Sequence, residues 1–330
     1  MKKYLLEIIV FICGAVVMIL EIVGARILAP FLGTSMIVWT SLIGMVLGSL
    51  SFGYWYGGKL SDKKPDFQKF SFIIFSAGLF VGLFFLVESF ILTFIQNFIQ
   101  NIYLGTIMAS FVLFSPPSVL LGMVSPYVIK LKLDDLKTSG ATVGNLFAFS
   151  TLGSIVGTFA AGFLLIPWLG SQSIIFYLSV VLIFSSLVVS PQKMLIKVSA
   201  FFLISACFFN FRFFQPSLAE GATLDIDTRY NRVIISDYIN TSSFQKIRGM
   251  SFSPHGMQSA MFLEDDDLVF DYTKFYRLGG YFNPNIKEAL MIGGAGYSYP
   301  KDFLSKHSDA NMDVIEIDPK LTELAKDFLN

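Results

Sequence analysis

Long apolar runs are the feature that most constrains the fold of this chain. The hydrocarbon core of a bilayer is about 30 Å thick, and a helix crosses it with about 20 apolar residues. Seven runs approach this length, with approximate bounds 5–28, 36–56, 70–90, 104–125, 141–166, 171–190 and 194–214. The sequence therefore predicts a multi-pass α-helical membrane domain over residues 1–214, with the lipid bilayer as its first partner.

The first and the seventh runs differ from the others. Two lysines precede the first run, as in a signal peptide, but the run is too long for one and carries Glu21 and Arg26, so we expect a retained helix. Lys197 and Arg212 interrupt the seventh run and leave only residues 198–211 uncharged, which is short for a span. The expected number of spans is therefore six or seven.

The distribution of lysines predicts how the spans are oriented. Lysines occupy the expected loops 59–69, 130–137 and 191–197, whereas the alternate loops 29–35, 91–103 and 167–170 carry no Lys or Arg. Because basic loops stay in the cytoplasm, we expect a cell membrane protein whose N-terminus is cytoplasmic. Six spans would return the C-terminal part to the cytoplasm and seven would not, so its side stays open.

Glycines recur four or five residues apart within two of the runs. They are Gly44, Gly48 and Gly53 in the second run, and Gly153, Gly157 and Gly162 in the fifth. Small residues at this spacing let helices approach closely. Plain helix packing is the main interpretation, and a moving transport interface is the alternative.

The second part of the chain has a different charge balance. Residues 1–216 hold 13 Lys and Arg against 7 Asp and Glu, whereas residues 217–330 hold 11 against 17. This balance excludes a basic nucleic-acid-binding protein. Cys13 and Cys207 both lie in apolar runs, and with two His they provide neither a disulfide framework nor a metal-ligand cluster, so no metal is expected.

Strand patterns begin after the membrane domain. Residues 228–238 carry the β-branched run of a strand, and residues 244–263 read as two further strands with a turn near 253–256. A small β-rich subdomain is therefore expected over 215–265. A helix is expected over 266–280, where apolar residues recur near helical spacing.

The last 65 residues predict the first half of a Rossmann-like fold over 266–330. The expected order is a strand at 288–292, a glycine-rich turn at 293–296, a helix at 298–306, a strand at 312–317 and a helix at 319–329. Glycines let the backbone approach a ligand, and an acid after the second strand, Glu316, accepts hydrogen bonds from ribose hydroxyls. Tyr299 stands where a dinucleotide fingerprint has its third glycine, which favours an S-adenosylmethionine-type domain over NAD. A βαβα unit without ligand is the alternative.

These motifs resemble the polyamine aminopropyltransferases (the spermidine synthase family), especially their membrane-fused bacterial relatives. The segments that carry the resemblance are Glu21, 26–30, Gly33, Trp39 and 57–62 in the first part, and 230–231, 258–261, 271–272, 282–284, 290–296 and 314–319 in the second. The resemblance implies aminopropyl transfer from decarboxylated S-adenosylmethionine to a polyamine acceptor.

The resemblance also implies roles for individual residues. Glu316 would bind the ribose of decarboxylated S-adenosylmethionine or methylthioadenosine, and Asp318 would support that site. The turn would be lined by Gly293, Gly294 and Gly296. Gln258 would contact the nucleoside, and Tyr230 with Asn231 would stand at the family's Tyr-Gln ligand position.

Departures from the family pattern limit what is expected of this chain. Gly296 stands where the family has the Asp that contacts the aminopropyl amine, and 270–272 reads Phe-Asp-Tyr instead of Tyr-His-Glu. The family's remaining acids would lie beyond Asn330, so the catalytic residues are unknown and we expect an inactive fragment of a longer protein.

Two alternatives and two smaller questions stay open at this point. The alternatives are a membrane transporter or sensor whose tail binds a nucleoside or polyamine without chemistry, and an S-adenosylmethionine-dependent methyltransferase. The acidic run 264–267 either contacts polyamine or forms a solvated turn at a helix N-terminus. A homo-oligomer is likewise left open.

Overall fold

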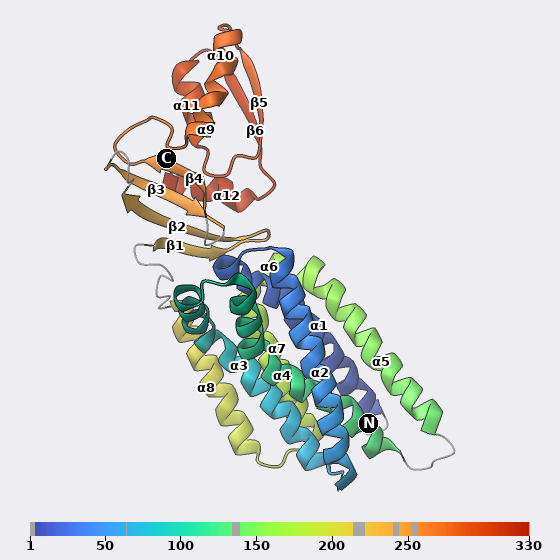
Figure 1. The fold of residues 1–330 in the computed structure, drawn as a ribbon. Helices are drawn as coiled ribbons and strands as arrows, with labels where there is room; N and C mark the ends of the chain where they lie inside the picture. Colours follow the sequence, from blue (N-terminus) through green and yellow to red (C-terminus); the bar gives the residue numbers. More distant parts are fainter. Residues whose placement is uncertain are drawn as a thin grey trace. The chain divides into compact units, whose positions relative to one another are not determined.

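The computed structural model describes residues 4–63, 65–133, 139–213, 222–239, 244–252 and 256–329. The chain divides into two compact units, Met1–Gln215 and Pro216–Asn330 (Figure 1). The first unit is helical, and the second contains two small sheets together with short helices.

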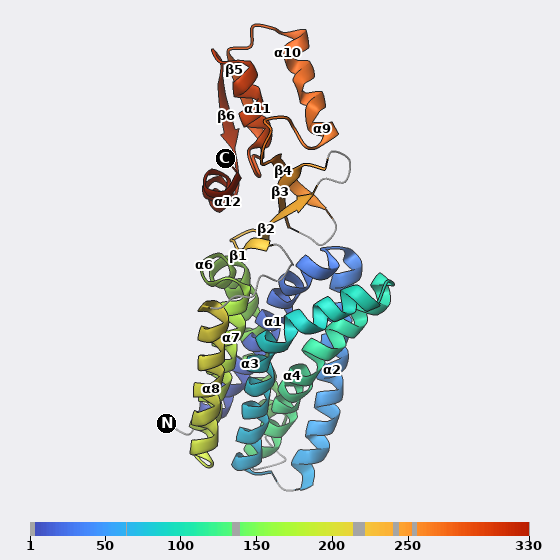
Figure 2. The same cartoon turned by 90° about the vertical axis from the view of Figure 1, so that its left-hand side faces the viewer.

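The first unit is a bundle of long apolar helices. Its elements are α1 (Leu5–Leu32), α2 (Met36–Lys63), α3 (Phe67–Phe98), α4 (Ile102–Lys132), α5 (Ser139–Ala160), a π-helical turn (Ala161–Leu165), α6 (Ile166–Leu169), α7 (Ser171–Val189) and α8 (Met194–Phe213). Both views show α1, α3, α4 and α7 running alongside one another (Figures 1 and 2).

Six helical segments within the described residues are long and apolar enough to cross a membrane. They are Leu5–Leu32, Met36–Lys63, Phe67–Phe84, Ile102–Lys132, Ser139–Leu169 and Ser171–Val189. The helix at the expected seventh span is present as α8, but its apolar stretch, Met194–Asn210, is shorter than a full span. The count of six agrees with a multi-pass membrane protein and with the weak seventh run in the sequence.

The expected basic loops are partly helical. α2 continues through the 57–63 segment, α4 continues to Lys132, and α8 already begins at Met194. Close packing explains the extension of α2, because Gly57 lies against Met123 of α4, where a Cβ would approach a backbone atom to 2.7 Å. An ion pair between Asp62 and Lys130, 2.9 Å long, joins the same two helices.

Three of the six expected glycines are at close helix contacts. Gly53 of α2 faces α4, as Gly57 does, and Gly153 and Gly157 of α5 face α1, each with backbone atoms closer than a Cβ tolerates. The other three glycines of the pattern, Gly44, Gly48 and Gly162, have open space where a Cβ would be. The glycine pattern therefore marks real packing contacts at only part of its positions.

Gly153→Ala and Gly44→Ala are expected to change stability in opposite directions. A Cβ at Gly153 would lie 2.0 Å from the carbonyl oxygen of Phe11, so α1 and α5 must separate, at a cost of about 2 kcal/mol. No atom lies within 4 Å of a Cβ at Gly44, where alanine is the better helix former by up to about 1 kcal/mol. Thermal unfolding of the full chain in detergent measures both, and equal shifts would contradict the packing argument.

The second unit begins with a four-stranded antiparallel sheet. Its strands β1 (Ala222–Asp227), β2 (Arg232–Ile239), β3 (Lys246–Ser251) and β4 (Met257–Phe262) lie in sequence order. The apolar face packs on the helix α12 (Pro319–Leu324), and the buried cluster consists of Val233, Ile235, Met250, Met261, Leu321 and Leu324. This packing joins the first strands of the unit to its last helix (Figure 2).

Two parallel strands form the second sheet. β5 (Glu288–Ile292) pairs with β6 (Asn311–Ile315), and the helix α11 (Ser298–Lys306) connects them. A helical segment precedes them, consisting of α9 (Asp271–Lys274), a 3₁₀ turn (Phe275–Arg277) and α10 (Leu278–Phe282), and a π-helical turn (Ala325–Leu329) follows α12. Strand, glycine turn and crossover helix agree with the sequence expectation to within one or two residues.

Three expectations for this unit are corrected. The strand expected from 228 begins at Arg232, because Thr228 forms a turn with Asn231 (N to O, 2.8 Å), and β1 before it was not expected. The helix expected over 266–280 begins only at Asp271 and is broken by a 3₁₀ turn. The acidic run therefore precedes the helix instead of opening it. The turn expected near 253–256 lies mainly outside the described residues.

Candidate functional site

The glycine-rich turn between β5 and α11 has an unusual backbone. Gly293 has φ +84°, and the non-glycine residues Ala295 and Tyr297 have φ +45° and +58°. Left-handed conformations are easy for glycine and strained for other residues. Gly294 has no room for a side chain, since a Cβ would lie 2.7 Å from the ring of Tyr297. The turn is thus tight, and two of its strained positions carry side chains.

Glu316 holds this turn with its carboxylate. Its Oε2 accepts hydrogen bonds from the amides of Gly294 (2.8 Å) and Ala295 (3.0 Å), and its Oε1 accepts from the amide of Asp318 (3.0 Å). The parallel register explains the position, because the strands end side by side at Ile292 and Ile315. Ligands of open α/β sheets bind at this end of the strands.

The pKa of Glu316 is lowered from its ordinary value. Partial burial of the carboxyl group acts to raise the pKa, but hydrogen bonds from four backbone N–H groups, beginning with that of Asp318, outweigh it. These donors favour the charged carboxylate. Glu316 is therefore an ionised hydrogen-bond acceptor at neutral pH.

Glu316→Gln is expected to loosen the turn at neutral pH but not at low pH. A pKa that is lower in the folded state means that the carboxylate stabilises the turn above the unfolded pKa of about 4.3 and loses this effect as the pH falls through the folded value. Because Glu316 is partly exposed, we expect a loss of only about 1 kcal/mol, or about fivefold in amide protection.

Hydrogen exchange of the 293–297 amides in the full chain measures this difference. After correction for the intrinsic exchange rate, the ratio between wild type and Glu316→Gln should approach one below the folded pKa of Glu316. A ratio that stays constant from neutral to acidic pH would contradict the role of the carboxylate charge.

Asp318 is buried directly beside Glu316. Its side chain is at the N-cap of α12, where Oδ1 accepts the amide of Lys320 at 3.1 Å. The other oxygen, Oδ2, is buried and has no hydrogen-bond partner among the described residues. Asp318 thus anchors the helix that follows Glu316 and orients its own amide toward the Glu316 carboxylate.

Tyr297 is a part of the turn that the sequence did not reveal. Its hydroxyl shares a hydrogen bond of 2.7 Å with Thr322 of α12, and its ring covers Gly294. The only signal available in the sequence was a bulky residue directly after the glycine cluster 293–296. Tyr297 ties the turn to α12 and fills space that glycine would leave open.

The structure brings some expected site residues together but not others. Gly293, Gly294, Gly296, Glu316 and Asp318 meet at the ends of β5 and β6.

Gln258 lies on β4, exposed, next to Ser259, whose hydroxyl lies 3.4 Å from that of Ser298 at the start of α11. The amides of Tyr230 and Asn231 both donate to the hydroxyl of Thr228. Among the described residues no hydrogen bond joins Gln258, Tyr230 or Asn231 to Glu316.

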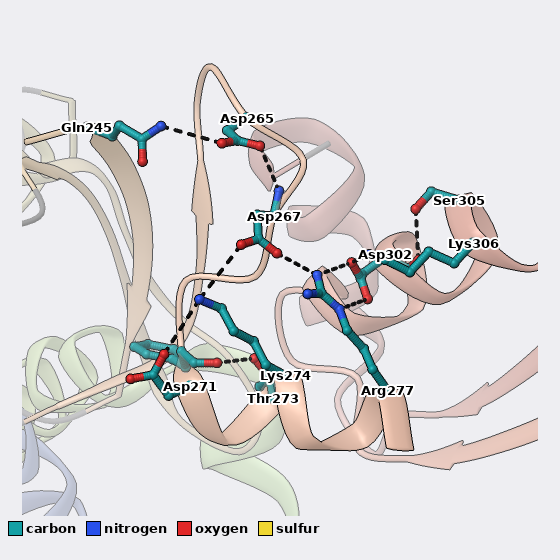
Figure 3. A network of polar contacts seen from close by, with 11 residues as sticks. Gln245, Asp265, Asp267, Asp271, Thr273, Lys274, Arg277, Asp302, Ser305 and Lys306 are labelled. Atoms are coloured by element: carbon teal, nitrogen blue, oxygen red, sulfur yellow. Dashed lines mark hydrogen bonds and ion pairs between the residues drawn. The ribbon is translucent and has the colours of Figure 1, made fainter. Parts of the chain in front are cut away.

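Three residues of the acidic run 264–267 contact other groups of the chain itself, namely Asp265, Asp266 and Asp267. Asp267 accepts a hydrogen bond from Arg277 at 2.5 Å, and Asp266 lies 3.2 Å from Lys301 (Figure 3 shows the network around Asp267). Asp265 accepts the amide of Asp267 at 3.0 Å. These contacts favour the interpretation as a structured turn over contact with polyamine. The described residues contain no group of three or more His, Cys, Asp or Glu placed to hold a metal ion.

One comparison with known proteins connects this chain to an enzyme class. A polyamine aminopropyltransferase of Vibrio vulnificus (strain CMCP6) is 31% identical over 65 residues, which are 20% of this chain and 22% of that protein. No family model matches the chain, and no solved structure matches it. The similarity indicates a partial relationship to polyamine aminopropyltransferases, over about a fifth of the relative's length.

Proposed function

We propose that this chain is a membrane-bound protein of the aminopropyltransferase type, whose second unit binds the adenosyl group of decarboxylated S-adenosylmethionine. The proposal combines six membrane-capable helices, the partial similarity to a polyamine aminopropyltransferase and the ligand chemistry of Glu316. In this proposal residues 266–330 form part of a Rossmann-like domain, and residues 215–265 form the β-rich subdomain before it.

The observation that carries the proposal is the carboxylate between two strand ends. Glu316 accepts hydrogen bonds from the backbone N–H groups of Gly294, Ala295 and Asp318, at the place where the ribose of an adenosyl ligand lies in α/β nucleoside sites. Ribose hydroxyls are donors of the same kind, so they can take the place of the amides of Gly294 and Ala295. Nucleoside binding would then open the turn and move its hydrogen bonds onto the ligand.

The proposed chemistry is the attack of an amine on a carbon next to a sulfonium. A nitrogen–carbon bond forms as the carbon–sulfur bond breaks, methylthioadenosine leaves, and the amine gives its proton to a carboxylate or to water. In this proposal Glu316 and the glycine turn hold the nucleoside end of the donor. Gly296 offers no charge to the amino group of the donor's aminopropyl chain, so other groups must bind that amino group.

The same proposal includes an orientation in the membrane. Lysines at the ends of α2 and α4 favour a cytoplasmic position for those ends, and with them for the N-terminus. Six spans would then bring the second unit to the cytoplasmic side, where adenosyl donors are made, whereas a crossing by α8, which packs along α3 and α7, would bring it to the other side. A reporter fused after residue 213 that is active only in the cytoplasm tests this part.

Calorimetric titration of the full chain in detergent with methylthioadenosine tests the nucleoside site. We expect saturable binding, and heat indistinguishable from dilution at millimolar ligand would contradict the proposal. A donor labelled in its aminopropyl group then tests the reaction class. Label in a polyamine product supports aminopropyl transfer. If methylthioadenosine binds but no labelled product forms, only the nucleoside-binding part of the proposal stands.

A further inference from the structure

A cavity of about 410 Å³ opens in the first unit, among residues that take no part in the proposed nucleoside site. It lies between the end of α2, the first turns of α3, the end of α7 and the start of α8. The views place the α2–α3 and α7–α8 connections at the same end of the bundle (Figures 1 and 2). Its basic and amide lining consists of Gln68, Lys69, Gln192, Lys193 and Lys197.

Lys197 is a buried cation at the bottom of this cavity. Its side chain is 4% exposed, and its ammonium group donates to the Ser71 hydroxyl and to the carbonyl oxygens of Ser186 (3.0 Å) and Ser190 (2.7 Å). All three acceptors are neutral. The ammonium group therefore has its hydrogen bonds but no anionic partner among the described residues, which leaves its charge uncompensated.

The rim and the walls of the cavity have two different chemistries. Lys69 and Lys193 are exposed at the rim and add two positive charges. The walls consist mainly of apolar side chains. Two of these side chains, Phe72 and Ile196, are 55% and 54% exposed, so the cavity continues onto an apolar surface of the bundle. A ligand that fits has a compact anionic group attached to a hydrocarbon chain.

We propose that this cavity binds an anionic phospholipid, with its headgroup phosphate held by Lys69 and Lys193 near the buried charge of Lys197, and an acyl chain along Phe72 and Ile196. Charge complementarity selects the headgroup, because three lysines and no carboxylate line the cavity. The apolar wall selects a lipid over a free phosphate ion. The site is independent of the proposed nucleoside chemistry.

Native mass spectrometry of the full chain in detergent tests the site with dihexanoyl phosphatidylglycerol and the matching phosphatidylcholine. We expect phosphatidylglycerol to bind at least tenfold more tightly. The double variant Lys69→Gln, Lys193→Gln should bind it about 30-fold more weakly, since each lysine near an anionic lipid contributes about fivefold.

Lys63→Gln is the matched control, because Lys63 is an exposed lysine near the same α2–α3 connection but outside the cavity lining. Its affinity for phosphatidylglycerol should equal that of the wild type. Equal binding of the two lipids, or equal affinity of the double variant and the control, would overturn the proposal. Displacement of the lipid by inorganic phosphate at the same concentration would also overturn it, because the hydrocarbon chain would then contribute nothing.

Discussion

Glu316→Ala is expected to weaken the binding of methylthioadenosine to the full chain by at least about 100-fold. Two ribose hydroxyls would lose a charged acceptor, and a hydrogen bond to a charged group contributes about 1.5–3 kcal/mol. The carboxylate is held in place before the ligand arrives, by the amides of Gly294, Ala295 and Asp318. In the proposed binding mode the ribose hydroxyls replace the amides of Gly294 and Ala295, and breaking these two hydrogen bonds offsets part of the gain. We therefore expect the loss of affinity to lie near the lower end of the range for two charged hydrogen bonds.

Glu288→Ala is the matched control for this experiment. Glu288 lies at the opposite end of β5, where its side chain contacts Asn311 at 3.3 Å, so its loss should leave the affinity unchanged. The affinity of Glu316→Gln for methylthioadenosine should lie between those of Glu316→Ala and Glu288→Ala, because an amide oxygen still accepts a hydrogen bond but carries no charge. Equal affinities of wild type and Glu316→Ala, measured by calorimetry, would remove the basis of the proposed nucleoside site.

Glu316 also shows how far a sequence predicts such a site. The expected strand, turn, helix and strand agree with β5, the 293–296 turn, α11 and β6, because each has a local signal: an apolar run, a glycine cluster or a helical period. The hydrogen bonds of Glu316 have no such signal. They depend on the turn's dihedral angles and on the parallel register, which brings residues 22 positions apart into contact.

The misses in the β-rich part have a similar physical origin. β1 reads as a polar segment in the sequence. In the structure a bidentate ion pair between Asp225 of β1 and Arg232 of β2 stabilises it, with N–O distances of 2.9 and 3.0 Å. The helix expected from residue 266 starts late because Leu268 forms an isolated bridge with Met261 of β4. Both features arise from pairing partners that periodicity along the chain does not show.

Membrane spans were predictable for a different reason. A run of about 20 apolar residues has few alternatives, since the backbone in lipid must satisfy its own hydrogen bonds within a helix. The ends of the spans were less predictable, because tertiary contacts extend them. α2 runs on through a segment that reads as a basic turn, held against α4 by the Asp62–Lys130 pair and by Gly57.

Asp302→Ala is expected to destabilise the second unit by about 3 kcal/mol. The carboxylate of Asp302 is 1% exposed and accepts two hydrogen bonds from the guanidinium group of Arg277, at 2.6 and 3.0 Å, and another from Lys306 (Figure 3). Burial acts to raise the pKa of Asp302, but Arg277 and Lys306 lower it overall, so the group is ionised at neutral pH. Removal of the Asp302 carboxylate leaves Arg277, which is partly buried, with one carboxylate partner among the contacts of Figure 3, that of Asp267.

Hydrogen exchange locates this loss, because Arg277 and Asp302 join the helical segment before β5 to α11. The amides of α11 should exchange about 100-fold faster in Asp302→Ala, which is the factor that corresponds to about 3 kcal/mol. Asp271→Ala is the control, since the Asp271 side chain is 94% exposed and its 3.5 Å contact with Lys274 is a surface ion pair of little energetic weight. If the two variants exchange alike, the Arg277–Asp302 contact does not support α11, and the glycine turn in front of that helix must be held by Glu316 and Tyr297 alone.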